Sequence, residues 1–248
     1  MKVIFHEDFY RSYCSDPAAA PGRIEAIVNA VRNQVTFVEA IAANPDDIKA
    51  VHTKSHIDMV KREGIYDIAS LSAGGAIQAA ETGLTEPCFA LIRPPGHHAS
   101  GGSAWGFCYF NNMAIAVEKL KRENRIRSAL ILDFDLHFGD GTVNILASRE
   151  YATIYNPSES TAGAYLKGVN NFLFSMKADV IGVSAGFDNH LDDWGGLLST
   201  EDYKTMGSLV REAAKAHGTG YFAILEGGYN HNVLGRNVMA FIEGMEGE

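Results

Sequence analysis

The sequence is poor in cysteine and has no long apolar run. Its three cysteines, Cys14, Cys88 and Cys108, are scattered and form no CxxC pair. This pattern is typical of a reduced compartment and argues against a metal site built from thiolates. No stretch approaches the roughly 18 consecutive apolar residues of a membrane span, and the first residues lack the apolar core of a signal peptide. We therefore expect a cytoplasmic protein without a membrane partner.

Positive charge is also scarce. Lys and Arg number 21 against 30 Asp and Glu, which gives a formal net charge of -9. The basic residues at 119–127 lie among Glu118 and Glu123 and are typical of a solvated helix end. Without a basic patch, binding to nucleic acid is not expected. The length of 248 residues and the 46% hydrophobic content suit one globular domain over 1–248.

Apolar runs alternate with amphipathic segments along the chain. The runs predict strands at 2–5, 88–92, 128–135, 152–155, 179–185 and 221–226. Helical spacing of apolar residues predicts helices at 22–43, 66–82, 110–123, 163–176, 201–217 and 231–243. Thr200 is the expected N-cap of the helix at 201–217, and Gly218 its expected end. The alternation predicts an α/β fold with a mainly parallel central sheet flanked by helices.

Polar, titratable residues follow four of the predicted strands. They are His97 and His98 after 88–92, the segment 135–140 after 128–135, Asp188 after 179–185, and Tyr229 after 221–226. Ligands of open α/β sheets bind outside the carboxyl ends of the strands. One such loop would be ordinary surface polarity, but four of them predict a functional site at this edge.

The stretch "LILDFDLHFGDG" (130–141) contains Asp133, Asp135 and His137 at alternate positions. In a strand these side chains point the same way. Two adjacent carboxylates repel each other unless a cation or a proton lies between them. A divalent metal held by an Asp, a His and Asp188 would resolve the repulsion and leave a position for water. The alternative, that the carboxylates cap helices, explains one of them but not the row with His137.

Further candidates lie close to this row. Asp140, between two glycines, could orient a histidine. His97 and His98 could be metal ligands, but the spare carboxylates favour an acid/base pair acting on water. Tyr229, on a Gly-Gly turn, could donate a hydrogen bond to a developing oxyanion or could simply close its loop. The default expectation of a surface position without function applies to His52, His56, His217 and His231.

These motifs resemble those of the zinc-dependent histone deacetylase family, including its bacterial and archaeal acetylpolyamine amidohydrolase-like members. The matching segments are "VHTKSHI" (51–57), "RPPGHHA" (93–99), "GFCYFNN" (106–112), "LDFDLHFGDGT" (132–142), "SAGFD" (184–188) and "LEGGYN" (225–230). The forms "RPPGHHA" and "LEGGY" are closer to class II and prokaryotic members than to class I. The resemblance implies an arginase–deacetylase fold and hydrolysis of an N-acetyl amide, such as acetyl-lysine, an acetylpolyamine or a related small amine.

The resemblance also implies roles for individual residues. Asp135, His137 and Asp188 would bind Zn²⁺, or Fe²⁺ as the alternative metal. His98, paired with Asp140, would be the general base and then the general acid. His97, paired with Asp133, would be its electrostatic partner.

Substrate contacts and a second ion follow from the same resemblance. Tyr229 would polarise the acetyl carbonyl, Phe107 would line one wall of an acyl-lysine-sized channel, and Gly106 could contact the substrate backbone. Potassium would bind near Asp133, Asp135 and His137, partly through backbone oxygens. Tyr155 falls near a family serine that helps to bind this ion, so the potassium site is less firmly implied than the zinc site.

The chain departs from the family in the short segment 156–168. Relatives carry a longer loop there that supplies the second aromatic channel wall, so this wall has no assigned residue. An open pocket and completion of the rim by a second subunit of a homo-oligomer both remain possible.

Two other functions stay open. An arginase-type ureohydrolase would bind two manganese ions and would need a carboxylate where this chain has His190. A catalytically silent binder of acetylated ligands would be expected to have lost a metal ligand or Tyr229, and none is lost.

Overall fold

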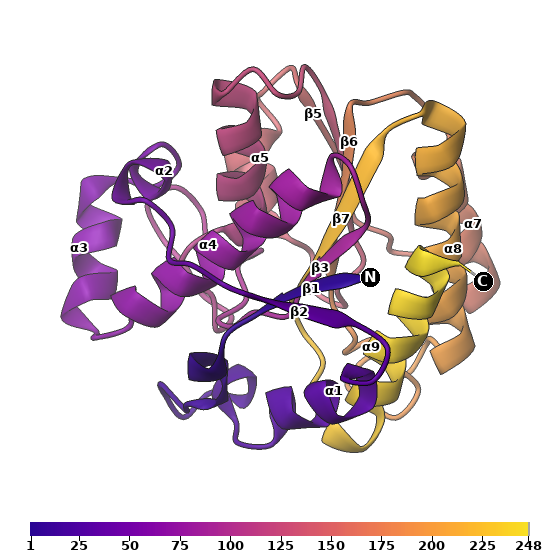
Figure 1. Cartoon of the computed structure of the whole chain (residues 1–248), viewed down its shortest axis with the longest axis horizontal. Coiled ribbons are helices and arrows are strands. Elements are labelled where there is room, and N and C mark those ends of the chain that lie inside the picture. Colours follow the sequence, from indigo (N-terminus) through magenta and orange to yellow (C-terminus); the bar gives the residue numbers. More distant parts are fainter. Residues whose placement is uncertain (248) are drawn as a thin grey trace.

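The computed structural model describes residues 1–247 and contains one seven-stranded sheet (Figure 1). Its strands are β1 (Lys2–Phe5), β2 (Thr36–Glu39), β3 (Cys88–Ala90), β4 (Ala129–Asp133), β5 (Ala152–Tyr155), β6 (Val180–Ala185) and β7 (Gly220–Leu225). Their order in the sheet is β2-β1-β3-β7-β6-β4-β5, and every neighbouring pair is parallel. All carboxyl ends therefore lie at one edge, as the predicted α/β fold requires.

Helices cover both faces of this sheet (Figure 1). On one face α4 (Tyr66–Gly83) packs on β1, β3 and β7, and α5 (Asn112–Arg122) packs on α4 and β6. On the other face α8 (Thr200–His217) contacts β6 and β7 and is flanked by α7 (Ala162–Leu173) and α9 (His231–Glu246), with α1 (Arg23–Val31) against α9. The remaining α-helices of the described residues are α2 (Pro45–Lys49), α3 (Lys54–Arg62) and α6 (Asp140–Leu146). Two short 3-10 helices, Glu7–Tyr10 and Pro17–Ala19, follow β1.

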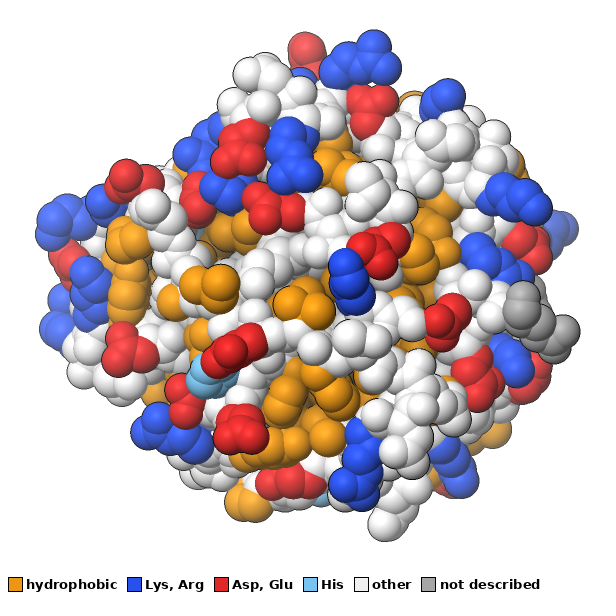
Figure 2. Space-filling model, viewed as in Figure 1, with side chains coloured by type: hydrophobic (Ala, Val, Ile, Leu, Met, Phe, Trp, Pro, Cys, Tyr) orange, Lys and Arg blue, Asp and Glu red, His pale blue; other side chains and the backbone are white. Residues whose placement is uncertain are grey.

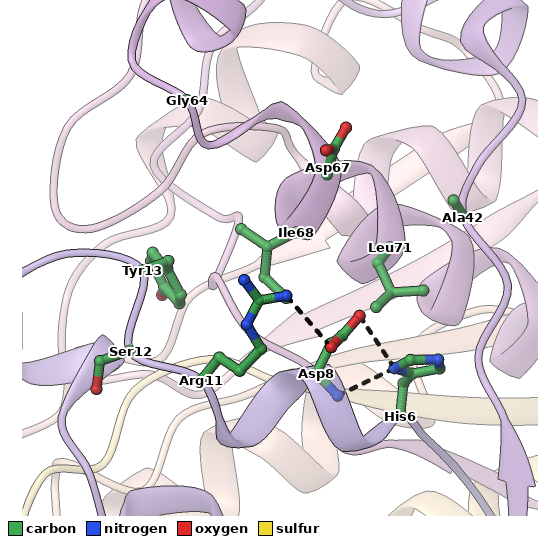
Figure 3. A pocket seen from close by; sticks show the side chains of 10 residues that line it. All are labelled: His6, Asp8, Arg11, Ser12, Tyr13, Ala42, Gly64, Asp67, Ile68 and Leu71. Carbon is green, nitrogen blue, oxygen red and sulfur yellow. Dashed lines mark hydrogen bonds and ion pairs between the residues drawn. The ribbon is translucent and has the colours of Figure 1, made fainter.

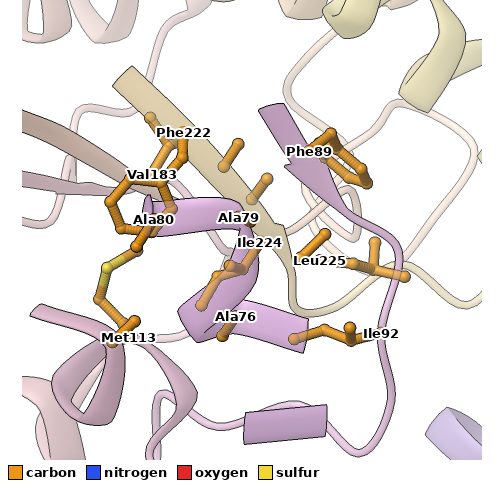
Figure 4. Packing of buried hydrophobic residues seen from close by; sticks show 14 of the residues in the cluster. Ala76, Ala79, Ala80, Phe89, Ile92, Met113, Val183, Phe222, Ile224 and Leu225 are labelled. Carbon is orange, nitrogen blue, oxygen red and sulfur yellow. The ribbon is translucent and has the colours of Figure 1, made fainter. Parts of the chain in front are cut away.

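The core forms because the central strands are apolar on both faces, as is usual for a sheet covered by helices on each side. Every residue of β4 and β6 is buried. Small side chains of α4, including Ala76, Ala79 and Ala80, lie beside Phe222 and Ile224 of β7 (Figure 4). At the end of α4, a Cβ on Gly83 would lie 2.8 Å from the Cβ of Phe222. Only glycine lets the helix approach β7 this closely.

One predicted helix is wrong in its second half. The helix expected over 22–43 ends at Val31, and β2 (Thr36–Glu39) follows it as an edge strand paired with β1. Val35 and Val38 continue the helical spacing, but β-branched residues also suit a strand, and pairing with β1 prevails. The sequence analysis also missed the short helices α2, α3 and α6. The other predicted helices and strands lie within a few residues of their observed bounds.

The N-cap of α8 was predicted one residue too late. Ser199, not Thr200, is the cap: its Oγ accepts a hydrogen bond from the Asp202 backbone N–H at 3.3 Å. The Asp202 carboxylate accepts one from the Ser199 backbone N–H at 2.8 Å, which completes a capping box. Gly218 ends the helix as predicted, in the left-handed conformation with φ +65°.

The surface carries charges of both signs. On the face seen in Figure 2, Lys and Arg side chains are interspersed with Asp and Glu, so this face presents no continuous basic area. Among the helices of the described residues, none combines the length and hydropathy needed to span a bilayer.

Candidate active site

The four strands that precede the candidate residues are neighbours at the centre of the sheet, in the order β3-β7-β6-β4. The loops after these strands therefore meet at one edge. They bring together the predicted residues His97, His98, Asp133, Asp135, His137, Asp140, Asp188 and Tyr229, which lie within a network of hydrogen bonds, ion pairs and ring contacts.

The three predicted metal ligands form a compact cluster. Asp135, His137 and Asp188 each offer one ligand atom, and these atoms lie within 4.8 Å of one another. His137 Nδ1 is 3.2 Å from Asp135 Oδ1 and 3.1 Å from Asp188 Oδ2. Asp188 Oδ2 is buried and has no hydrogen-bond partner beyond this contact with His137. A buried carboxylate oxygen without a backbone donor, beside a second carboxylate and an imidazole, fits a divalent cation with mixed O and N ligands.

Backbone groups hold the two carboxylates of this cluster. The other oxygen of Asp135, Oδ2, accepts a hydrogen bond from the Gly227 backbone N–H at 2.8 Å, and Asp188 Oδ1 accepts one from Leu136 at 3.0 Å. A Cβ on Gly186 or Gly227 would lie 2.0 or 2.5 Å from Asp135 Oδ2. Glycine is therefore required at both positions to let two loops close on one carboxylate.

The cluster concentrates negative charge in a buried place. Burial alone would raise the pKa of Asp135, but His97 and several hydrogen bonds lower it overall. Burial and then the charge of Asp135 raise the pKa of Asp188 to about 6. Hydrogen bonds to Asp135 and Asp188 raise the pKa of His137 to about 10. Two carboxylates of this kind favour a positive charge between them, which a proton or a metal ion can supply.

Each of the two adjacent histidines is paired with its predicted carboxylate. His97 Nδ1 lies 3.1 Å from Asp133 Oδ2, and His98 Nδ1 lies 2.7 Å from Asp140 Oδ1. The two imidazole rings are 4.0 Å apart. The predicted pairing is thus present, while the catalytic roles of the pairs stay predictions.

The two histidines have opposite electrostatic surroundings. Burial disfavours a charge on His97, but Asp135 and Asp133 outweigh burial and raise its pKa well above the usual value. Burial and then the neighbouring His97 lower the pKa of His98 to about 4. His98 is therefore neutral near pH 7, with Nδ1–H donating to Asp140 and Nε2 left as an acceptor.

Tyr229 lies beside these groups near the end of the loop between β7 and α9. Its backbone N–H donates to Asp193 Oδ2 at 2.8 Å, and its ring lies edge-on to Phe107 with centroids 5.9 Å apart. Burial and then the charge of Asp135 raise the pKa of the phenol, so it remains a hydrogen-bond donor. Gly106 and Phe107 both have positive φ, and a Cβ on Gly106 would lie 2.4 Å from His98 Cδ2.

The sequence analysis missed Glu226, the last residue before the Gly-Gly turn. This fully buried carboxylate accepts hydrogen bonds from the Gly96 and His97 backbone N–H groups, at 2.7 and 3.3 Å. Ser184 Oγ donates to its other oxygen at 3.1 Å. Burial raises the pKa of Glu226 to about 7. An acid at the end of the otherwise apolar run "YFAILE" was the available signal, because a buried charge needs partners.

Both tryptophans of the chain were also missed. The Trp105 ring lies over His98 with centroids 3.8 Å apart, and its Nε1–H donates to Asp140 Oδ2 at 2.9 Å. The Trp194 ring stacks on Tyr229 at 4.0 Å with an interplanar angle of 22°, and lies edge-on to His137 at 6.0 Å. Their rarity in the sequence was the only signal.

Two of the histidines expected at the surface are buried instead. His52 and His56 are 3% and 2% exposed and stack on each other at 5.0 Å. His52 Nε2 accepts a hydrogen bond from the Asn111 backbone N–H at 2.9 Å, and His56 Nε2 lies 2.6 Å from the Tyr109 carbonyl oxygen. The default surface assignment is wrong for this pair because loop polarity says nothing about tertiary packing. His217 and His231 are half-buried.

The shortened segment 156–168 borders a cavity of about 480 Å³ beside the site. Asp135, Leu136, Asn156, Tyr165 and Asn189 are among its lining residues. The Tyr155 hydroxyl donates to Glu159 rather than to the acid row, at 2.7 Å. Potassium binding near Asp133 therefore stays a prediction.

A second cavity of similar size lies between the segment 6–13, which follows β1, and the first turns of α4 (Figure 3). Its charged groups largely satisfy one another: Asp8 lies 3.4 Å from Arg11 and 3.7 Å from His6. None of the residues discussed at the strand ends lines this cavity.

Comparison with known proteins agrees with the fold and identifies the family. The sequence profile of the "Histone deacetylase domain" matches residues 61–157 and 153–245. A crystal structure of the HDA15 HD domain superimposes with a TM-score of 0.85 at 24% sequence identity, covering 100% of this chain and 89% of that one. The superposition supports the arginase–deacetylase fold.

Curated relatives carry related names. A "Probable deacetylase" of Methanothermobacter thermautotrophicus is 32% identical over 92% of this chain and 85% of its own. A "Histone deacetylase-like amidohydrolase" of Pseudomonas aeruginosa is 26% identical over 89% and 73%, respectively. The "Polyamine deacetylase HDAC10" of Mus musculus is 25% identical over 99% of this chain and 48% of its own. The chain belongs to the histone deacetylase family, and this membership supports an enzyme that hydrolyses acetylated amides.

Proposed function

We propose that the protein is a metal-dependent deacetylase that hydrolyses the N-acetyl amide of a small amine or of an acetyl-lysine peptide. The observation that carries this proposal is the Asp135–His137–Asp188 cluster, in which Asp188 Oδ2 has no donor other than the His137 ring, next to two separate His–Asp pairs. A buried carboxylate oxygen without a backbone donor is the exception in a purely structural network.

Asp135, His137 and Asp188 would hold the metal, with Zn²⁺ the first candidate and Fe²⁺ the alternative. A divalent ion there would lower the pKa of water and polarise the acetyl carbonyl. Both effects are needed for amide hydrolysis near neutral pH.

The chain's own residues would move the proton. His98 is neutral at pH 7, so its Nε2 can take a proton from the attacking water while Asp140 holds Nδ1. The same proton would then go to the leaving amine nitrogen as the C–N bond breaks. His97 would remain charged through its contacts with Asp133 and Asp135 and so stabilise negative charge nearby.

Tyr229 would donate its phenolic O–H to the acetyl oxygen. Its raised pKa keeps the proton on the phenol, and the donor matters most when negative charge develops on that oxygen. Phe107, edge-on to Tyr229, would line the path of the alkyl chain, and Gly106 would face the substrate backbone.

The proposal is tested with protein loaded with Zn²⁺ and offered N-acetylputrescine, N-acetylspermidine and an acetyl-lysine peptide. Acetate release is expected for at least one of them. Tyr229→Phe should lower kcat about 100- to 1,000-fold, the usual cost of removing one oxyanion donor. Its zinc content should not change, because Tyr229 is outside the predicted ligand set.

Tyr66→Phe, which removes a hydroxyl from a ring packed on Phe110, is the matched control and should retain activity. No acetate from any substrate, or a fully active Tyr229→Phe variant, would overturn the proposal.

The ureohydrolase alternative gains no support from the site. His190 stands where the second metal would need a carboxylate. Its Nδ1 instead accepts a hydrogen bond from the Asp192 backbone N–H at 3.0 Å.

A further inference from the structure

The wall opposite Phe107 is the missing part of the proposed site. The one aromatic residue of the segment 156–168, Tyr165, is buried and donates its hydroxyl to the Phe134 carbonyl oxygen at 3.0 Å, so this segment presents no exposed aromatic side chain. In the proposed reaction the acetyl group contacts both Tyr229 and the cluster around His137. An exposed side chain that touches both of these is therefore a candidate for the channel wall.

Trp194 contacts both. Its indole lies nearly parallel to the Tyr229 ring, with centroids 4.0 Å apart, and meets the His137 ring edge-on at 6.0 Å. Phe107 meets the same Tyr229 ring edge-on at 5.9 Å. The indole is nevertheless 53% exposed, so the stack on Tyr229 leaves part of its surface free for a ligand.

The loop that carries Trp194 is tied to the Tyr229 turn. Asp193 Oδ2 accepts hydrogen bonds from the backbone N–H groups of Tyr229 and Asn230, both at 2.8 Å. The Gly195 backbone N–H donates to the Asp188 carbonyl oxygen at 2.8 Å. The indole is thus positioned from both sides, by the turn after β7 and by the predicted metal ligand after β6.

We propose that Trp194 forms the second wall of the substrate channel, in place of the aromatic residue that the short segment 156–168 does not provide. The inference deepens the proposed function, since it concerns the same site. An exposed, pre-positioned indole suits the alkyl chain of a linear N-acetylated amine, which would bury apolar surface against it. The acetyl group itself would lie deeper, beyond Trp194.

The position of the wall gives a test with two substrates. Trp194→Ala should raise KM for N-butylacetamide about tenfold relative to wild type, a loss of about 1.4 kcal/mol. It should leave KM for N-methylacetamide, which lacks the alkyl chain, nearly unchanged. Trp194→Phe keeps an aromatic ring on Tyr229 and should recover most of the loss. Equal KM changes for both amides, or none, would overturn the proposal.

A second variant tests whether the loss of any exposed aromatic side chain would change the two KM values in this way. Phe174, 43% exposed at the end of α7, provides the matched control, and Phe174→Ala should leave both KM values unchanged. A fall in kcat without a change in KM in Trp194→Ala would assign Trp194 to positioning Tyr229 and would contradict a wall.

Fluorescence provides a measurement that does not need turnover. The chain has two tryptophans, so Trp105→Phe leaves Trp194 as the single tryptophan. N-butylacetamide should change the emission of that variant in a saturable way, and N-methylacetamide should change it much less. If the wild-type protein hydrolyses no substrate but this response is present, the proposed function fails and the binding wall stands. If hydrolysis occurs without the response, the wall alone fails.

Discussion

At the scale of single residues, the site separates groups that face the metal position from groups that hold the histidines. Asp188 gives Oδ1 to a backbone N–H and keeps Oδ2 for the cluster, while both oxygens of Asp135 accept backbone N–H groups and Oδ1 also faces the His137 ring. Asp133 and Asp140 instead contact the Nδ1 atoms of His97 and His98. Carboxylates from one short stretch thus have two different tasks.

This division predicts different losses for two Asp→Asn variants. Asp135→Asn removes a charged ligand and should greatly weaken zinc binding, measured by metal analysis after dialysis. Asp140→Asn should keep the zinc and lower kcat about 10- to 100-fold, the usual cost of losing the partner that orients a functional histidine. Zinc lost from Asp140→Asn, or zinc kept by Asp135→Asn, would show that the tasks are assigned wrongly.

The sequence analysis correctly placed Asp135 and His137 together, but the strand alternation on which it relied is not what positions them. Strict alternation within a strand implied that Asp135 and His137 share a direction, yet β4 ends at Asp133. Backbone donors from other loops, such as Gly227, aim the side chains instead. Residues whose roles depend entirely on such loop contacts, Trp105 and Trp194, could not be predicted, since no local pattern marks them.

At the scale of elements, some segments take the secondary structure that their local sequence predicts, and others take the one that strand pairing imposes. The predicted region 66–82 agrees with α4 because its pattern has no competing partner. The region 22–43 divides into α1 and β2 because the edge of β1 offers hydrogen bonds to Thr36–Glu39. Such competition is tertiary, so the spacing of Val35 and Val38 could not reveal it.

The capping box of α8 gives a prediction at this scale. Ser199→Ala removes the acceptor of the Asp202 backbone N–H and leaves one end of α8 without its cap. The free energy of unfolding should fall by about 1 kcal/mol, measured by urea denaturation. Ser199→Asn, whose side chain can still accept that N–H, is the control and should retain most of the stability. Thr200→Ala is no control, because the Thr200 hydroxyl donates to the buried Asn237 Oδ1 at 2.6 Å. Equal losses in Ser199→Ala and Ser199→Asn would contradict the assignment of Ser199.

At the scale of the whole molecule, buried histidines couple the fold to pH. His52 follows α2 and accepts a hydrogen bond from the backbone of Asn111, whose side chain caps α5. The contact joins the α2–α3 region, at the left of Figure 1, to α5, the helix that follows the loop carrying His97 and His98. Burial and then the neighbouring His56 lower the pKa of His52 to about 3, from an unfolded value of 6.5.

The sign of the effect follows from proton binding. Below pH 6.5 the unfolded chain takes up a proton at His52 and the folded chain does not, down to about pH 3. The stability contributed by the neutral imidazole is therefore complete above pH 6.5 and declines as the pH falls toward 3. At about 1.4 kcal/mol per pH unit, lowering the pH from 7.5 to 5 should cost about 2 kcal/mol through this residue.

His52→Gln tests this linkage, because an amide oxygen can accept the Asn111 hydrogen bond but takes up no proton. The variant should be less stable than wild type at pH 7.5, and its urea-unfolding free energy should fall less on acidification, by about 2 kcal/mol between pH 7.5 and 5. Other buried acids and bases, including those of the candidate site, contribute equally to both proteins, so the difference isolates His52. Identical pH dependence in the two proteins would mean that His52 is not held neutral by burial.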